Sequence, residues 1–398
     1  MVSICFYFQV HQPHRMKHYR IFDIGKNSDY FDEEKNKQIL RKVSDKCYIP
    51  ATKMILELLR RYPGFKVCFS FSGTVLEQLE NYDKGVLELF KEVIKTGRAE
   101  ILSETYYHSI SSLYSKEEFL RQINEHKRKI KKIFDYTPKV FRNTELIYNN
   151  EIAKIIEQQG FKGIITEGAD HILGWRSPNF VYLPIGAKKI KLLMKNYKLS
   201  DDIAFRFSSR EWKEWPLKAE KFAQWVNAIN GNGTNVNLFM DYETFGEHQW
   251  EDTGIFEFMK KLPEEILKHP DNNFKTPSEL IEKYEPVGEI DVHHPISWAD
   301  IERDISAWTG NPMQNSAINS LYEIEKKVLE SEDYKIISDW KKLTTSDHFY
   351  YMCTKWFNDG DVHKYFSPYD SPYDAFMNFM NILEDIKLRL DKKEVKEA

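Results

Sequence analysis

The sequence SICFYFQV at Ser3–Val10 is a short apolar run, and the polar residue His11 follows it at once. Its length and its content of aromatic and branched residues are typical of a buried strand. We expect further strands at Lys66–Ser72, Ala99–Ser103, Lys139–Thr144, Gly163–Thr166, Ile203–Phe207, Val236–Met240 and Glu289–Val292. Segments with helical spacing lie between them, for example at Glu117–Phe134, Glu151–Gln159 and Lys218–Asn230. This alternation predicts an α/β fold built on parallel strands.

The strand pattern ends at about Pro295, and helical spacing dominates the rest of the chain. Helices are expected at Ile301–Trp308, Asn315–Leu329, Asp347–Phe357 and Pro372–Leu390. A chain of 398 residues also exceeds the size at which one hydrophobic core usually stops growing. We therefore predict a catalytic β/α domain over residues 1–295 and a C-terminal helical region over residues 296–398.

Composition narrows the class of partner. The formal net charge is −4, and the basic residues are scattered, so neither nucleic acid nor an anionic membrane is an expected partner. No apolar stretch reaches the roughly 18 residues that span a bilayer, and the N-terminal run lacks the basic flank of a signal peptide. The four cysteines form no C-x-x-C pair. We expect a cytoplasmic protein with a neutral partner, and the abundance of Lys, Glu and Ile suits a heat-adapted source.

Polar or ionisable residues follow several of the expected strands directly. They are His11, Glu104, Glu145, Glu167, Asp241 and His293. The carboxyl ends of parallel strands in a β/α barrel meet on one face, so these side chains are expected to share a cleft. Strand ends often carry polar residues simply because loops begin there. That explanation is reasonable for any one of these residues but less so for all six together.

Two carboxyl groups on one rim are typical of glycoside hydrolysis. Glu145 follows Arg142 and Asn143, which could hold it ionised, as a nucleophile requires. Asp241 ends an apolar strand beside Tyr242, where burial would raise its pKa, as a general acid requires. From the residues alone, four other carboxyl groups compete for these roles, namely Glu77, Glu104, Glu167 and Glu243.

Five segments in order resemble the sequence blocks of glycoside hydrolase family 57. They are FYFQVHQPHR at Phe6–Arg15, SGTVLEQL at Ser72–Leu79, FRNTELIYNN at Phe141–Asn150, FMDYETFGEHQW at Phe239–Trp250 and TSDHFYYM at Thr345–Met352. The segment PISWADIERDISAWTGNPMQ at Pro295–Gln314 resembles the α-amylase branch. The resemblance implies a distorted (β/α)7 barrel followed by a helical bundle. It also implies a double-displacement mechanism that retains the anomeric configuration and needs no cofactor or metal.

The resemblance assigns roles block by block. Glu145 matches the nucleophile and Asp241 the acid/base, while three residues match positions that line the donor subsites, namely His11, Glu77 and Asp347. His248 and Tyr350 stand where glucanotransferase-like relatives carry Trp. The implied activity is hydrolysis of α-1,4 bonds in starch, glycogen and maltooligosaccharides, with 4-α-glucanotransfer as the alternative. We also expect His248 and Trp250, and Glu104 with His108, to contact the glucan.

Two rival functions remain open at the level of the sequence. A metal-dependent deacetylase or mannosidase-like barrel could use the H-x-x-x-H spacing of His14 and His18, together with His11, His108, His293 and His294. The sequence has no Asp-Asp pair at an earlier strand end that would complete the metal-ligand set of such an enzyme. A noncatalytic glycan-binding protein on the same scaffold is the second rival, although both catalytic carboxyl groups are present. The sequence predicts no oligomeric state.

Overall fold

Within the described part of the chain, ten strands in two sheets form the centre of the molecule. The computed structural model describes residues 1–355 and 367–397. The first sheet has the order β3-β2-β1-β8, and β9 also pairs with β1. Its strands are β1 (Ser3–Val10), β2 (Val67–Phe71), β3 (Ala99–Ile101), β8 (Asn235–Asp241) and β9 (Asn273–Phe274). The second has the order β10-β6-β7-β5-β4. Its strands are β4 (Val140–Arg142), β5 (Gly163–Thr166), β6 (Val181–Pro184), β7 (Lys191–Met194) and β10 (Glu289–Ile290).

Seven of these strands are arranged as a distorted barrel. All strand pairs are parallel except β6 with β7. An isolated parallel bridge between Ser103 and Phe141 connects the β3 edge to the β4 edge. At the other edges, Asn196 after β7 donates its backbone N–H to the carbonyl of Asn237 in β8, at 2.9 Å. The order β8-β1-β2-β3-β4-β5-β7 thus runs around the barrel, with bridges rather than full ladders at two positions. The predicted α/β class is confirmed.

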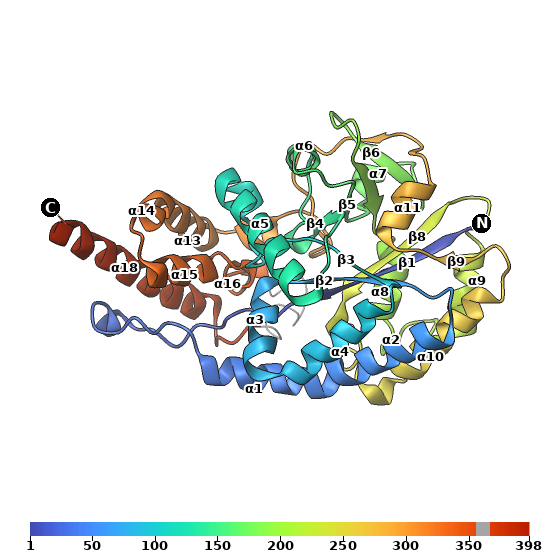
Figure 1. Cartoon of the computed structure of the whole chain (residues 1–398), viewed down its shortest axis with the longest axis horizontal. Coiled ribbons are helices and arrows are strands. Elements are labelled where there is room, and N and C mark those ends of the chain that lie inside the picture. The colour runs from blue at the N-terminus through green and yellow to red at the C-terminus, as the bar shows by residue number, and fades with distance from the viewer. Residues whose placement is uncertain (356–366, 398) are drawn as a thin grey trace.

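Helices cover the barrel and form its C-terminal extension (Figure 1). Around the strands lie α1 (Glu33–Val43), α2 (Ile49–Arg61), α3 (Gly73–Tyr82), α4 (Lys84–Lys95), α5 (Lys116–Phe134), α6 (Asn150–Gln158), α7 (Asp170–Leu173), α8 (Tyr197–Ala204), α9 (Ala219–Asn227), α10 (Ile255–Leu267) and α11 (Pro277–Lys283). The later helices are α12 (Ser306–Thr309), α13 (Pro312–Glu323), α14 (Glu325–Glu330), α15 (Tyr334–Leu343), α16 (Ser346–Tyr350) and α18 (Pro372–Glu397). Among the described residues, no helix is long and apolar enough to cross a bilayer.

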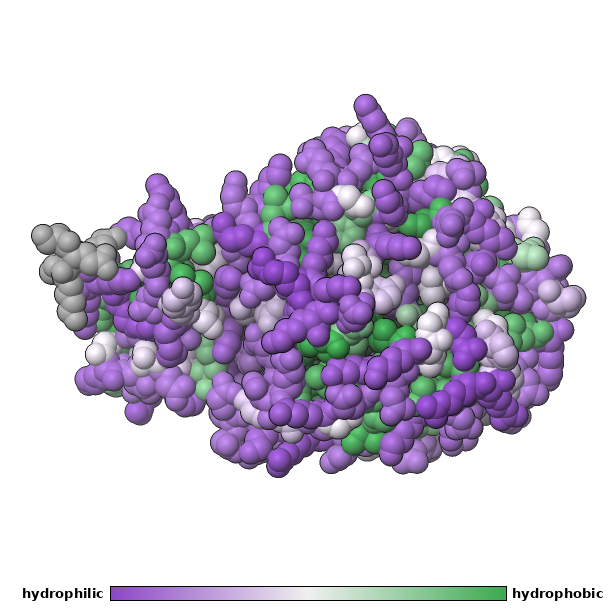
Figure 2. All heavy atoms as spheres, viewed as in Figure 1, coloured by the Kyte–Doolittle hydropathy of each residue, from purple (hydrophilic) through white to green (hydrophobic). Residues whose placement is uncertain are grey.

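The helical region after residue 295 shares a hydrophobic core with the barrel. Phe141 of β4 and Tyr148 belong to the same buried cluster as Trp340, Phe349 and Phe379 of the later helices. Figure 1 shows α13, α15, α16 and α18 gathered at one end of the strands. The face seen in Figure 2 is mostly hydrophilic, with apolar residues in scattered groups. The helices therefore bury their apolar sides against the barrel and against one another.

Several predicted elements are wrong. Ile203–Phe207 is not a strand, because α8 extends to Ala204. The N-cap of this helix is Asn196, whose side chain accepts a hydrogen bond from the Leu199 N–H. Ile301–Trp308 is helical only from Ser306. The predicted helix at Asp347–Phe357 corresponds to the shorter α16, and its last two residues lie outside the described ranges. The sequence interpretation also missed β6, β7, β9 and α15.

Gly246 lets the turn after β8 pack closely against residues 44–48. Its φ is +113°, and a Cβ atom there would lie 1.9 Å from the carbonyl oxygen of Lys46. We expect Gly246→Ala to lower the free energy of unfolding by about 2–5 kcal/mol, since backbone strain and overpacking add. Urea unfolding measures this change. Gly288→Ala is the matched control, because a Cβ there meets nothing within 4 Å; equal effects of the two substitutions would contradict the prediction.

Candidate active site

A cavity of about 430 Å³ opens at the carboxyl ends of the parallel strands. This volume is typical of small-molecule sites. Six of the predicted site residues line it, namely His11, His108, Glu145, Asp241, His248 and Asp347. Glu145 comes from the turn after β4, and Asp241 is the last residue of β8. The barrel thus brings both predicted catalytic carboxyl groups to one cavity, and α16 contributes Asp347.

Glu145 has a strained backbone. Its φ and ψ are 57° and 24°, and Leu146 also has a positive φ of 52°. Such angles cost a residue other than glycine on the order of 1–3 kcal/mol and are common at functional sites. Neighbouring contacts hold the turn in place: the Asn143 amide donates to the carbonyl of Ile147, at 2.9 Å, and Leu146 is fully buried. The turn presents the Glu145 side chain to the cavity.

Three donors hold the Glu145 carboxylate. His108 Nε2 lies 3.2 Å and Ser346 Oγ 3.3 Å from its Oε1. The indole N–H of Trp298 donates to Oε2 at 2.7 Å. Burial alone raises the pKa of Glu145, but the hydrogen bond from His108 and the nearby cationic groups outweigh it, so the pKa lies below its ordinary value. Glu145 is therefore ionised at neutral pH.

His108 bridges two carboxylates. Its Nδ1 lies 2.9 Å from Oε2 of the fully buried Glu104, and its Nε2 faces Glu145. Burial lowers the pKa of His108, but hydrogen bonds to both carboxylates raise it overall, to about 9. Burial opposes ionisation of Glu104, yet His108 and Arg142 bring its pKa down to about 2. Glu104, which was predicted to contact glucan, is not among the residues that line the cavity, but it hydrogen-bonds with two that do, His108 and Gln9.

Asp241 has the opposite electrostatic setting. Burial, and then the negative charge of Glu145, raise its pKa to about 6. Among the described residues, no side chain donates a hydrogen bond to its carboxyl group. The two carboxyl groups therefore titrate in different ranges, and below about pH 6 Asp241 carries its proton while Glu145 is ionised. Such a division is the pattern of a nucleophile and a general acid.

His11 and Asp347 form a second pair beside the first. His11 Nε2 lies 2.9 Å from Asp347 Oδ2, and its Nδ1 lies 2.7 Å from Ser72 Oγ. The ring of His11 stacks on that of His108, with centroids 3.9 Å apart. Burial, and then the charge of His108, lower the pKa of His11. Burial raises the pKa of Asp347, but the two imidazoles outweigh it and hold that pKa well below its ordinary value. Asp347 thus stays ionised.

Besides Glu104, two predicted substrate contacts, Glu77 and Trp250, lie outside the described lining of this cavity. Glu77 accepts hydrogen bonds from His14 at 3.0 Å and from Tyr106 at 2.7 Å. Trp250 is 56% exposed, and its indole N–H donates to the carbonyl of Glu247. His248 does line the cavity, and burial lowers its pKa to about 4, so it is neutral there.

Glu167 and Glu243, which compete with Glu145 for the catalytic role in the sequence, have different surroundings in the structure. Glu167 is fully buried and pairs with Lys195 and Arg303, both at 3.4 Å. Glu243 lines the cavity and accepts a hydrogen bond from Tyr48. Burial, and then the charge of Asp241, raise the pKa of Glu243 to about 8, so it is mainly protonated at neutral pH. Neither setting suits a nucleophile as well as that of Glu145.

The sequence interpretation missed Trp298, which contacts Glu145 directly. Its only signal was its place in the segment PISWADIERD, where it was read as part of a family block rather than as a site residue. Lys195, Asp201 and Arg303 also line the cavity without having been predicted. Charged residues in loops are too common for the sequence to single these out.

The histidines of the metal-dependent rival do not gather at one place. His14 pairs with Glu77, whereas His18, His293 and His294 are exposed. In the described parts of the chain, no three His, Cys, Asp or Glu side chains are placed to hold a metal ion. The rival function therefore lacks a ligand set in the described residues.

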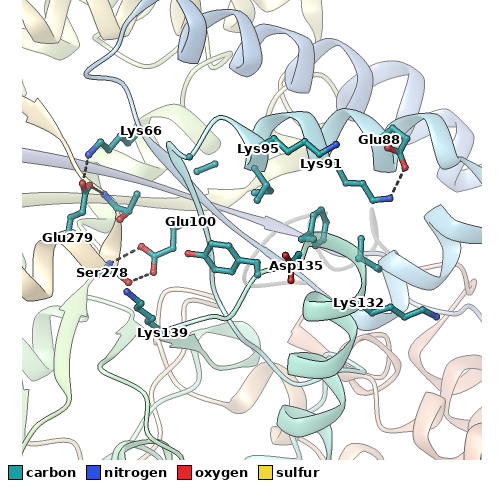
Figure 3. Close-up of a pocket in the computed structure, with 17 residues that line it drawn as sticks. Lys66, Glu88, Lys91, Lys95, Glu100, Lys132, Asp135, Lys139, Ser278 and Glu279 are labelled. Atoms are coloured by element: carbon teal, nitrogen blue, oxygen red, sulfur yellow. Dashed lines mark hydrogen bonds and ion pairs between the residues drawn. The ribbon is translucent and has the colours of Figure 1, made fainter.

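A second cavity, of about 690 Å³, lies at the amino ends of β2, β3 and β4 (Figure 3). Much of its charge is internally paired: Lys66 with Glu279, and Lys91 with Glu88. The Glu100 carboxylate accepts two hydrogen bonds from Ser278. A second carboxyl group of this cavity is likewise engaged in structure, because Glu279 pairs with Lys66 and accepts a hydrogen bond from the Thr276 backbone N–H. The cavity at the carboxyl ends of the strands is therefore the better candidate for catalysis.

Solved structures share this fold at low sequence identity. The branching enzyme of Thermococcus kodakaraensis, solved in complex with glucose, superposes with a TM-score of 0.68 at 15% identity, over 91% of this chain and 87% of that chain. The 4-alpha-glucanotransferase of Thermococcus litoralis gives a TM-score of 0.59 at 19% identity, over 92% of this chain and 54% of that chain. These likenesses show the fold, a barrel with a helical C-terminal region.

Sequence comparison gives the family. A protein of Methanocaldococcus jannaschii, named as a provisional alpha-amylase, is 47% identical over 401 residues, covering 96% of this chain and 84% of the relative. The alpha-amylase of Pyrococcus abyssi is 24% identical over 62% of this chain, which spans only 37% of that enzyme. The sequence model of glycosyl hydrolase family 57 matches residues 5–293. The chain therefore belongs to glycosyl hydrolase family 57.

Proposed function

We propose that this protein is a retaining α-glucan hydrolase of the α-amylase type, acting on α-1,4 bonds of starch, glycogen and maltooligosaccharides. The observation that carries the proposal is the pair of cavity carboxyl groups whose pKa values are shifted in opposite directions, that of Glu145 lowered and that of Asp241 raised to about 6. The provisional alpha-amylase from Methanocaldococcus jannaschii supports the choice of substrate.

The proposed reaction has two steps. Glu145 attacks the anomeric carbon while Asp241 gives its proton to the departing glycosidic oxygen, which yields a glycosyl ester on Glu145 and a free glucan end. Asp241, now a carboxylate, takes a proton from water, and the water oxygen attacks the same carbon and releases Glu145. Two inversions at one carbon retain the α configuration.

The remaining cavity residues suit a neutral polyol. His11, Asp347 and His248 offer donors and acceptors to sugar hydroxyls, and the ionised Asp347 is a strong acceptor. We further propose that residues 1–295 form the catalytic barrel and that residues 296–398 complete its cavity through Asp347. A substrate contact by Glu77 or Trp250 and a cytoplasmic location stay predictions.

A second candidate function is 4-α-glucanotransfer, in which a sugar hydroxyl replaces water in the second step. Phe205 and Ile301 line the cavity yet are 62% and 84% exposed. Apolar side chains at a cavity mouth can pack against the C–H faces of an acceptor sugar. The named activity of the Thermococcus litoralis relative, 24% identical over 62% of this chain, points the same way.

The products of maltoheptaose distinguish these functions. We expect early reducing ends in the α form, seen by ¹H NMR before mutarotation, and shorter oligosaccharides as the main products, with or without a chelator. Products longer than the substrate would move the assignment to the glucanotransferase. Early β ends would contradict the retaining mechanism. Loss of turnover with the chelator, restored by zinc, would favour the metal-dependent rival.

A further inference from the structure

Trp298 holds the Glu145 turn at two points. Its backbone N–H donates to the carbonyl oxygen of Glu145 at 3.2 Å, and its indole N–H donates to Oε2 of the same residue at 2.7 Å. The first contact holds the strained backbone of Glu145, and the second fixes the side chain. A single residue from the loop before α12 therefore controls both the place and the orientation of this carboxylate.

Two cations lie over the indole ring of Trp298. The Arg142 guanidinium carbon lies 5.0 Å from the ring centroid, and Lys195 Nζ lies 5.4 Å from it. Arg142 is fully buried, and none of its guanidinium nitrogens hydrogen-bonds with a described protein group. Cations over the face of an indole draw its π electrons toward them. This polarisation makes the ring N–H a stronger donor to a carboxylate.

The loop that carries Trp298 is anchored in turn. Arg303 Nη1 donates to the Trp298 carbonyl at 2.6 Å, and its Nη2 donates to Asp201 Oδ2 at 3.1 Å. Asp300 and Arg303 both have positive φ angles, 55° and 54°. A strained loop with these anchors is a rigid support rather than a loose cover.

We propose that Trp298 is a positioning residue: its indole N–H keeps Glu145 oriented toward the anomeric carbon and favours its ionised form. The inference rests on the proposed function, in which Glu145 is the nucleophile. It adds that the low pKa of Glu145 depends on Trp298 as well as on the His108 imidazolium. Arg142 acts on Glu145 both directly by its charge and through the indole ring.

The test is Trp298→Phe, which keeps an aromatic ring but removes the N–H donor. We expect kcat on maltoheptaose to fall about 10- to 100-fold with KM within about 3-fold, because a hydrogen bond to a charged group is lost. The acid limb of the kcat/KM profile should move up by about 1–2 pH units for the same reason. A merely structural role would leave this limb where the wild type has it.

Trp308→Phe is the matched control. Trp308 lines the same cavity, but its indole N–H hydrogen-bonds with no described group. This substitution should leave the acid limb unmoved. Trp298→His, which keeps a ring N–H, should place the limb between wild type and Trp298→Phe, and it serves if the Phe variant does not fold.

The outcomes separate this inference from the function it rests on. An active Glu145→Gln enzyme would overturn the proposed function whatever Trp298 does. An inactive Glu145→Gln enzyme, with an unmoved acid limb in Trp298→Phe, would overturn the positioning role alone. A shift of equal size in Trp308→Phe would also overturn it, because the effect would then not depend on the contact with Glu145.

Discussion

Replacing Glu145 with Gln is expected to lower kcat on maltooligosaccharides by at least about 10⁴-fold, as loss of a covalent nucleophile does in other hydrolases. The amide nitrogen and oxygen of Gln are nearly isosteric with the carboxylate, but they form no stable ester with the anomeric carbon. The amide oxygen can take the place of Oε2 and still accept from Trp298, while the NH2 group takes the place of Oε1, which faces Ser346 and His108. Single-turnover kinetics measure the loss, and calorimetric titration with maltoheptaose should give a Kd within a few-fold of wild type.

Glu167→Gln is the matched control for this prediction. Glu167 is also a glutamate that follows a barrel strand, but it is fully buried and pairs with Lys195 and Arg303. Its replacement should lower the melting temperature, since two cations lose a buried partner, and should reduce kcat far less than Glu145→Gln does. Loss of the nucleophile should leave far less than about 1% of wild-type kcat. If Glu145→Gln kept more than that, the nucleophile would be another carboxylate.

The strand ends could be predicted because apolar runs of 4–8 residues stop at a polar residue. Ser3–Val10 and Gly163–Thr166 match β1 and β5 at both ends. The place of Glu145 and Asp241 follows from the same pattern, because parallel strands put their carboxyl ends on one face. The parallel strands and the two candidate catalytic residues can thus be predicted from local sequence patterns.

The missed elements have a different physical cause. The β7 strand begins with a lysine and follows a turn with two more, Lys188 and Lys189, so charged residues interrupt its apolar pattern. The apolar residues at 203–207 suggest a strand, but the cap at Asn196 starts a helix that places Ile203 and Ala204 on its buried side. Tertiary packing decides between the two readings of such short segments.

The electrostatics of the site could be predicted only in part. Burial of Asp241 was predicted from its apolar strand, and its raised pKa follows. The contacts of Glu145 come instead from residues distant in sequence, namely His108, Trp298 and Ser346. Only the folded chain brings these three together. The sequence favoured Arg142 as the partner of Glu145, and that residue acts by its charge without a hydrogen bond to Glu145.

Asp241→Ala is expected to have effects that depend on the leaving group. On maltoheptaose kcat should fall about 10²- to 10⁴-fold, because the leaving oxygen loses its proton donor. On α-maltosyl fluoride the first step should proceed at a rate within about 10-fold of wild type, because fluoride departs without that proton. Glycosyl-enzyme should then accumulate, since no base activates water, and mass spectrometry of the quenched protein should detect it on Glu145.

Rescue by azide and the pH dependence of kcat/KM test the acid/base role of Asp241 further. Azide needs no general base, so it should restore turnover of the fluoride by the Ala variant and give α-maltosyl azide. With a pKa of about 6 for Asp241, wild-type kcat/KM on maltoheptaose should fall about tenfold per pH unit once the pH exceeds that value, because the acid is then deprotonated. Glycosyl-enzyme formation from the fluoride by Asp241→Ala should lack this basic limb. An equal loss on both substrates, with no effect of azide, would instead make Asp241 a residue that shapes the cavity, because a proton donor matters only where the leaving group needs a proton.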